Sequence, residues 1–314
     1  MNGKKYDVVT VGIQCIDIVA SPVAAGVLDR ELTLSASTQL MLGGDALNQA
    51  VVLARLGAKV GLMGVAGKDR LGNVLTEQLA EFETLDVLNK RADVNTAISL
   101  VLIDEKGERH FVYQPESNLA LCYDHIDKDA VQNTAFLSIG GCLSLPGLDG
   151  KGTVELLKLA KEYGAQTALD FRISDARPNP DTLREILSLA DYVLPSEREA
   201  EALTGEDKSP EIMALRLRSM GAKNCVVKLG SKGCYVAADG YEGYVASYPC
   251  NCVDTTGAGD TFVGAFLYAK TKGWEIERCA KFACAAGSIA VEHTGANTAI
   301  QSIEQIEARM RIKP

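Results

Sequence analysis

Residues 254–262 read DTTGAGDTF, and an apolar stretch of helical character, GAFLYA, follows at residues 264–269. The glycines on either side of Ala258 leave successive backbone N–H groups uncovered where this helix would begin. A helix start of this kind binds anions through its free amides and the positive end of the helix dipole. Asp260 would lie in the first turn, where an acidic side chain also serves simply to balance that dipole. The stretch alone leaves both interpretations open, an anion site and an ordinary helix start.

A second glycine-rich helix start lies near the other end of the chain. Residues 43–50 read GGDALNQA and open a helical stretch whose apolar face ends at Gly57, a residue suited to terminate a helix. Taken alone, this cluster is explained equally well by a ligand site and by Asp45 acting as a helix cap.

Strand-like and helix-like segments alternate along the chain. Short β-branched and apolar runs predict strands, and longer segments of helical period predict helices. The expected strands are residues 6–13, 60–65, 136–139, 167–170, 192–194 and 225–229. The expected helices are residues 45–56, 71–82, 153–163, 181–189, 211–220, 259–271 and 276–291. This alternation predicts an α/β fold, a doubly wound and mostly parallel sheet with helices on both faces.

Two stretches interrupt the alternation. Residues 18–42 alternate apolar and polar positions without a convincing helix. Residues 97–113 hold two strand-like runs joined by a turn at residues 105–107, which is the pattern of a hairpin. No Pro/Gly/Ser-rich linker divides the chain, so we expect one domain over residues 1–314 with a small inserted sheet. This sheet is expected from about residues 18–42 and 97–118.

The composition excludes several classes of protein. The 314 residues carry 32 Lys plus Arg against 41 Asp plus Glu, a formal net charge of −9. Such a chain has no general field to attract nucleic acid or an anionic membrane, so we expect neither as a partner. No apolar run approaches the roughly 20 residues that span a bilayer. The polar N-terminus lacks a signal-peptide pattern, and the nine scattered cysteines indicate reduced thiols of a cytoplasmic protein.

Two common nucleotide-binding motifs and the usual histidine-based sites are absent from the sequence. It contains neither the GxxxxGK[ST] motif of P-loop proteins nor a GxGxxG motif after a strand. The three histidines, His110, His125 and His293, are dispersed, and their spacing supports neither a zinc site nor a hydrolytic triad.

The two glycine clusters together, in this order and spacing, closely resemble the ribokinase-like (PfkB) carbohydrate kinases. That family carries a GG-x-x-x-N motif near the N-terminus and a DTxGAGD motif near the C-terminus, and both are intact at residues 43–48 and 254–260. The resemblance covers essentially the whole chain and implies a ribokinase-like fold, in which the inserted sheet is a lid over the substrate. It implies ATP-dependent phosphorylation of a hydroxyl, primary where one is present, of a monosaccharide or sugar derivative.

The resemblance assigns the catalytic residues to the second motif. Asp260 matches the base that takes the proton from the sugar hydroxyl. Gly257, Ala258 and Gly259 match the anion hole for the transferring phosphoryl group, a role that suits a reaction governed by positioning and charge stabilisation. A carboxylate at a helix N-terminus is expected to be a weak base, which a loose transition state tolerates.

The substrate side matches in part. The positions that correspond to sugar contacts are Asp17, which we place at the end of the first strand, Gly43, Gly44 and Asn48. Cys15 stands where many members have asparagine, and Asp45 where ribokinases have lysine. Gly140 and Gly141 stand where ribokinases usually have a glutamate. These departures argue against D-ribose as the substrate.

The resemblance also implies a nucleotide side. The matching nucleotide-binding positions are Lys228, Gly230, Ser231, Gly233, Ser196 and Cys284. Glu199 matches the residue that organises Mg²⁺ through water, with Ser196 in place of the usual asparagine. A monovalent cation, K⁺, is implied at Asp254, Thr256 and Gly295.

Alternatives remain open from the sequence. A nucleoside kinase would share the scaffold and need stacking residues, for which Phe111, Tyr113 and Leu119 are the candidates. A non-catalytic sugar-binding module is disfavoured because the whole second motif is present. Arg109 and Arg172 are either solvated charges or contacts to an acidic substrate group. The exposed face of the lid predicts a homodimer formed through it.

Overall fold

The computed structural model describes residues 3–24, 26–105, 108–173, 179–205 and 209–313. Within these ranges, nine strands form a central sheet in the order β15-β14-β13-β12-β11-β10-β1-β4-β6. These strands are β1 (Tyr6–Gly12), β4 (Val60–Met63), β6 (Leu85–Val87), β10 (Thr134–Cys142), β11 (Gln166–Phe171), β12 (Tyr192–Val193), β13 (Asn224–Lys228), β14 (Cys234–Ala238) and β15 (Tyr241–Val245). Pairing is parallel from β6 through β13, and β14 and β15 add antiparallel strands at one edge.

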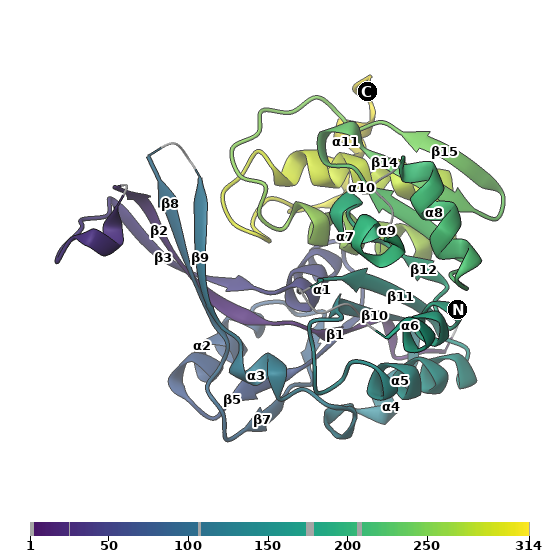
Figure 1. The fold of residues 1–314 in the computed structure, drawn as a ribbon, viewed down its shortest axis with the longest axis horizontal. Coiled ribbons are helices and arrows are strands. Elements are labelled where there is room, and N and C mark those ends of the chain that lie inside the picture. The colour runs from purple at the N-terminus through teal and green to yellow at the C-terminus, as the bar shows by residue number, and fades with distance from the viewer. Residues whose placement is uncertain (1–2, 25, 106–107, 174–178, 206–208, 314) are drawn as a thin grey trace.

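Helices cover both faces of this sheet (Figure 1). Side chains of successive strand residues point to opposite faces, so Val8 and Val9 of β1 belong to different apolar cores. One core is covered by α1 (Asp45–Arg55), α2 (Arg70–Leu79), α9 (Ala258–Thr271), α10 (Ile276–Ala290) and α11 (Ile303–Met310). The other is covered by α4 (Lys128–Gln132), α5 (Lys151–Glu162), α6 (Pro180–Ser188), α7 (Glu197–Thr204) and α8 (Pro210–Ser219). The predicted doubly wound sheet is confirmed.

The predicted inserted sheet is also confirmed and projects from the α/β body (Figure 1). In the described part of the chain it has four strands in the order β3-β2-β8-β9. They are β2 (Cys15–Val23), β3 (Ser37–Gly43), β8 (Ile98–Asp104) and β9 (Arg109–Gln114). We call this sheet the lid. The predicted hairpin is β8–β9, and residues 106 and 107 of its turn lie outside the described residues.

Smaller elements join the lid to the body. A two-stranded parallel sheet consists of β5 (Val65–Gly67) and β7 (Lys90–Ala92), and the short helix α3 (Glu116–Leu119) follows β9. None of the helices in the described ranges has both the length and the apolar character needed to cross a bilayer.

Two predicted strands differ from the observed ones. The strand expected over residues 60–65 is interrupted at Gly64, where the Gln14 side chain lies so close that a side-chain carbon on this glycine would collide with it. The first strand ends at Gly12, and a new strand begins at Cys15. The placement of Asp17 at the end of the first core strand was therefore wrong, since Asp17 lies in lid strand β2.

Candidate active site

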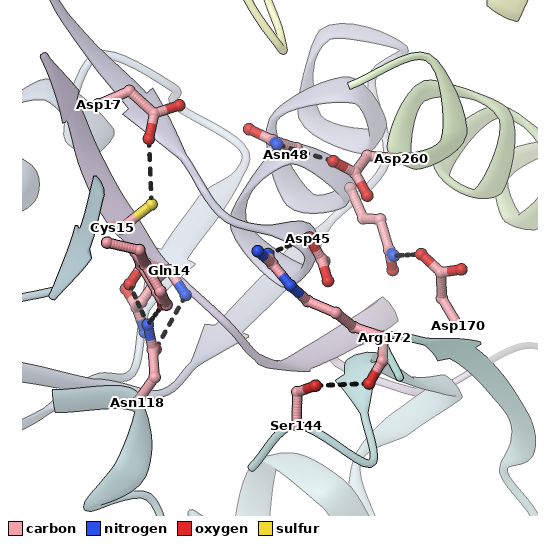
Figure 2. A network of polar contacts seen from close by, with 12 residues as sticks. Gln14, Cys15, Asp17, Asp45, Asn48, Asn118, Ser144, Asp170, Arg172 and Asp260 are labelled. Carbon is pink, nitrogen blue, oxygen red and sulfur yellow. Dashed lines mark hydrogen bonds and ion pairs between the residues drawn. The ribbon is translucent and has the colours of Figure 1, made fainter. Parts of the chain in front are cut away.

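The polar side chains that could bind a ligand or take part in a reaction lie beyond the carboxyl ends of the parallel strands. Asp170 lies near the end of β11, and Lys228 is the last residue of β13. The chain places β4 on one side of β1 and β10 on the other, so the strand order reverses at this point. Open α/β sheets bind ligands in the crevice at such a reversal. Figure 2 shows the polar network around this edge.

The N-terminus of α9 carries the predicted anion hole. Gly257 precedes the helix with φ of 69°, and a side-chain carbon there would collide with the backbone of Ala296. Only glycine suits this position. Among the described residues, the amides of Gly257, Gly259 and Asp260 have no hydrogen-bond acceptor, while Ala258 donates to the Thr255 carbonyl at 3.3 Å. Free amides and the positive end of a helix dipole are the features that bind anions in other proteins.

A buried ion pair places a positive charge beside this anion hole. The Lys228 Nζ lies 3.5 Å from where a side-chain carbon on Gly259 would stand. It donates to Asp170 Oδ1 at 2.6 Å, and both side chains are almost fully buried. Gln49 donates to the other Asp170 oxygen at 2.9 Å and accepts from Ser138 at 2.9 Å. Asp170 therefore holds the ammonium of Lys228, and Gln49 of α1 and Ser138 of β10 fix the orientation of Asp170 in turn.

Asp260 is oriented by an amide chain. Asn48 Nδ2, on α1, donates to Asp260 Oδ2 at 2.8 Å. The side-chain oxygen of Asn48, Oδ1, in turn accepts from Asn297 Nδ2 at 2.8 Å. Asn297 Nδ2 also donates to the backbone carbonyl of Leu42 at 3.1 Å. Asn48 was assigned to the sugar by the resemblance, and in this structure its amide positions the carboxylate of Asp260.

Asp260 is a stronger base than its place in the helix suggests. Burial, together with the charges of Asp45 and Asp170, raises its pKa well above the ordinary 3.8, although Asn48 and Lys228 act in the opposite direction. A helix dipole stabilises a carboxylate by about 0.3–1 kcal/mol, which lowers its pKa by less than one unit, because one pKa unit corresponds to roughly 1.4 kcal/mol. Burial raises a carboxyl pKa by up to about 3–5 units. The expectation of a weak base was wrong because burial outweighs the dipole.

This raised pKa predicts the pH dependence of catalysis. A base must be ionised to accept a proton, so kcat should fall as the pH is lowered through the raised pKa of Asp260, well above pH 3.8. Asp45→Asn should move the midpoint of this fall to lower pH, because it removes a negative neighbour that raises the Asp260 pKa. Measurements of kcat as a function of pH for the wild type and for Asp45→Asn check this prediction. A kcat that stays constant down to the range of an exposed carboxyl group would contradict it.

A cavity of about 540 Å³ opens on one side of Asp260. All the predicted nucleotide positions line it, namely Lys228, Gly230, Ser231, Gly233, Ser196 and Cys284. Glu199 lines it too, and its carboxylate accepts from the Ser196 amide at 2.7 Å, which fixes the start of α7. The stretch from Gly257 to Asp260 forms the inner wall. The structure thus brings the predicted nucleotide side and the anion hole together.

The predicted sugar residues lie outside the lining of that cavity, on the lid side of Asp260. Asp17 accepts from the Cys15 thiol at 3.3 Å, and burial raises the pKa of Asp17 to about 6. A side-chain carbon on Gly43 would collide with the Asp17 carboxylate. Gly44, with φ of 99°, packs against the Gln14 backbone. The two glycines therefore allow residues 43 and 44 to lie close to the Asp17 carboxylate and to the backbone of Gln14.

Arg172 extends between these two sides (Figure 2). Its guanidinium lies 3.7 Å from Asp45 Oδ1 and 5.6 Å from the centre of the Tyr113 ring, and half of its side chain is exposed. Its charge acts on the pKa of Asp17 as well as that of Asp45. Arg172 therefore faces the space between Asp17 and Asp260, whereas Arg109 lies elsewhere, against Asp254.

Several residues of the site carried no decisive signal in the sequence. Asp170 ends a predicted buried strand, a position that often points into a ligand crevice, and this signal could have identified it. Gln49 lies inside a helix and Asn297 in an irregular segment. Their roles depend on contacts 121 and 249 positions away in the sequence, to Asp170 and Asn48, which periodicity does not reveal.

Known proteins match this chain over nearly its full length. The family model described as "pfkB family carbohydrate kinase" matches residues 5–303. Fructokinase-1 of Oryza sativa subsp. japonica is 31% identical over 313 residues, covering 94% of this chain and 95% of the relative. Ribokinase of Staphylococcus aureus is 28% identical over 273 residues, covering 84% of this chain and 86% of the relative.

A solved structure agrees with the same family. Arabidopsis thaliana ribokinase, complexed with ribose and ATP, matches with a TM-score of 0.83 at 25% identity, covering 98% of this chain and 99% of the other. The chain therefore belongs to the pfkB family of carbohydrate kinases, phosphotransferases whose acceptor is an alcohol group.

Proposed function

We propose that this kinase transfers the γ-phosphoryl group of ATP to a hydroxyl of a monosaccharide or sugar derivative, a primary hydroxyl where the sugar has one. The observation that carries the proposal is the position of Asp260. Its carboxylate is held by Asn48, beside the free amides of the α9 N-terminus and the charged Lys228. The relative solved with ribose and ATP supports both substrates.

The reaction follows from this arrangement. The amides of Gly257, Gly259 and Asp260 stabilise the charge on the transferring phosphoryl group, and Lys228 adds a fixed positive charge. Asp260 accepts the proton of the attacking sugar hydroxyl, and its raised pKa favours this transfer. ADP leaves through the cavity lined by Gly230, Ser231 and Gly233 in this proposal.

The polar residues of the cavity suit a magnesium ion. Asp45, Ser196 and Glu199 line it and offer the oxygen donors that Mg²⁺ prefers. Glu199 has one carboxylate oxygen bonded to the Ser196 amide, which leaves the other available for a metal-bound water. When bound, Mg²⁺ neutralises charge on the β- and γ-phosphate oxygens.

The residues near the acceptor favour a sugar over a nucleoside. Asp17 and Asp45 carry carboxylates, which accept hydrogen bonds from hydroxyl groups, and the Arg172 guanidinium beside Asp45 provides donors. Of the stacking candidates, Phe111 is 57% and Leu119 46% exposed. Tyr113 already carries the Arg172 guanidinium over its ring at 5.6 Å, which makes this ring less available to stack on a base.

A screen tests the proposal. ADP release would be measured with ATP and Mg²⁺ against hexoses, ketoses, pentoses, pentitols and nucleosides. Sugar acids belong in the panel because Arg172 faces the acceptor side. The proposal expects release with at least one sugar or sugar derivative, and a response to nucleosides alone would favour the nucleoside kinase.

Asp17→Ala should weaken sugar binding and leave ATP binding unchanged. A hydrogen bond to a charged group contributes about 1.5–3 kcal/mol, so the Kd for the sugar should rise roughly 10- to 100-fold. Gly43→Ala should act in the same direction by displacing the Asp17 carboxylate without removing its charge. Calorimetry with sugar and with ATP checks both variants. An equal loss of ATP affinity would make Asp17 a structural residue.

We also propose a homodimer that forms through the lid. Lid strand β9 carries the exposed Phe111 (57% exposed), and the connection between lid strands β2 and β3 carries Leu28 (92%) and Leu34 (81%). In the described part of the chain, the outer lid strands β3 and β9 each pair on one side only. Light scattering should give twice the 33.5 kDa of one chain. The double variant Leu34→Glu/Phe111→Glu should give monomers, while Leu215→Glu on α8 should not. A monomeric wild type would contradict the proposal.

We propose a cytoplasmic location because the cysteines are free thiols. All nine are free of disulfides in the described structure, and most are buried. Reduced, buried thiols are characteristic of proteins from reducing compartments.

A further inference from the structure

The carboxylate of Asp254 is buried and almost fully engaged. Its Oδ1 accepts from the Thr256 amide at 2.8 Å and the Thr256 hydroxyl at 2.7 Å, and its Oδ2 accepts from the Gly295 amide at 2.9 Å. Burial acts to raise the pKa of Asp254, but these hydrogen bonds and the charge of Arg109 outweigh it and hold the pKa below 3.8. Asp254 is therefore a buried anion and needs a positive partner.

That partner comes from the lid. Arg109, on β9, donates from Nη1 to Asp254 Oδ1 at 2.7 Å, and its Nη2 donates to the Thr255 hydroxyl. The Arg109 side chain is 22% exposed and the Asp254 side chain 8% exposed. This is the only ion pair of Asp254 with any described residue, so the guanidinium supplies the charge that balances it.

The resemblance placed a monovalent cation at the same three residues, Asp254, Thr256 and Gly295. In this structure, Thr256 and Gly295 point hydrogen-bond donors at Asp254, and a guanidinium occupies the remaining direction of Oδ1. A cation needs oxygen lone pairs free of donors. The contacts at Asp254 thus fit a resident arginine better than a bound K⁺.

The pair lies where it can act on the anion hole. Asp254 lies three residues before Gly257, whose backbone packs closely against Ala296, the residue after Gly295. The bond from Gly295 to Asp254 and this close packing hold the two loops together. Arg109 belongs to the lid, so opening of the lid would withdraw the charge and leave Asp254 buried and unpaired, a costly state.

We propose that Arg109 is the built-in counter-ion of Asp254, which makes phosphoryl transfer independent of a monovalent cation and completes the anion hole only when the lid is closed. Arg109 is a positioning residue in this account, because it acts through the loop of residues 254–257. The inference rests on the proposed function.

Four proteins test the inference: wild type, Arg109→Ala, Arg109→Lys and Arg30→Ala, which removes an exposed arginine of the same lid region. We would measure kcat, both KM values and the melting temperature in potassium chloride and in tetramethylammonium chloride at equal ionic strength. Wild type and Arg30→Ala should give the same values in both salts. Arg109→Ala should lose roughly 10- to 100-fold in kcat in tetramethylammonium, with a smaller change in the KM for ATP. Potassium or added methylguanidinium should restore part of this loss, and Arg109→Lys should be intermediate.

The melting temperature separates this inference from the proposed function. A potassium-specific rise in melting temperature for Arg109→Ala alone supports the charge assignment even if no sugar is phosphorylated. A wild-type enzyme that requires potassium would overturn the inference. So would an Arg109→Ala variant with unchanged kcat and no specific response to potassium or methylguanidinium.

Discussion

Replacing Asp260 by asparagine should lower kcat by roughly 10²–10⁴-fold while ATP and sugar affinities stay close to those of the wild type. Asparagine keeps the size of the side chain and can still accept the hydrogen bond from Asn48, but it takes no proton from the sugar hydroxyl. Steady-state assays give kcat, and calorimetry gives the two affinities.

The matched control is Asp181→Asn. Asp181 also lies in the first turn of a helix, α6, and its side chain is 92% exposed, far from any proposed chemistry. If Asp260 only balanced a helix dipole, the two variants would behave alike, with effects below about 1 kcal/mol. An Asp260→Asn enzyme that keeps more than half of the wild-type kcat would remove Asp260 from the mechanism.

Replacing Lys228 by methionine should damage both stability and catalysis. Its partner Asp170 would remain as a buried and uncompensated charge, which typically costs about 3–5 kcal/mol of unfolding free energy. The anion hole would also lose its fixed positive charge, for which a loss of about 10²–10³ in kcat is expected. Denaturant unfolding and steady-state kinetics measure the two effects.

The double variant Lys228→Met/Asp170→Asn separates these effects. It removes both charges, so most of the lost stability should return, because a buried pair is costly mainly when it is broken. Activity should not return, since the ammonium beside Gly259 is still missing. Recovery of kcat in the double variant would show that Lys228 matters only for folding.

The sequence predicted the architecture because that information is local. The alternation of apolar runs and helical periods predicted a parallel sheet between helices, and the two glycine-rich helix starts carried the resemblance to the family. The boundaries of most core elements were correct within a few residues. The break at Gly64 was missed, and the side chain that packs closest to this glycine, Gln14, is distant from it in the sequence.

The electrostatics of the site could not be predicted in the same way. The base strength of Asp260 depends on Asp45 and Asp170, which come from different elements, and on a degree of burial that only the packed fold defines. Similarly, the sequence left Arg109 and Arg172 equivalent. The fold separates them, since one neutralises Asp254 and the other faces the acceptor side.

The central claim is that Asp260 directs a sugar hydroxyl to the γ-phosphoryl group of ATP. Phosphorus NMR of a reaction with ATP, Mg²⁺ and a sugar active in the screen tests it most directly. We expect ADP and a sugar phosphomonoester in equal amounts with the wild type, and neither product above background with Asp260→Asn. ADP accompanied only by inorganic phosphate, or a phosphomonoester formed equally fast by Asp260→Asn, would contradict the account.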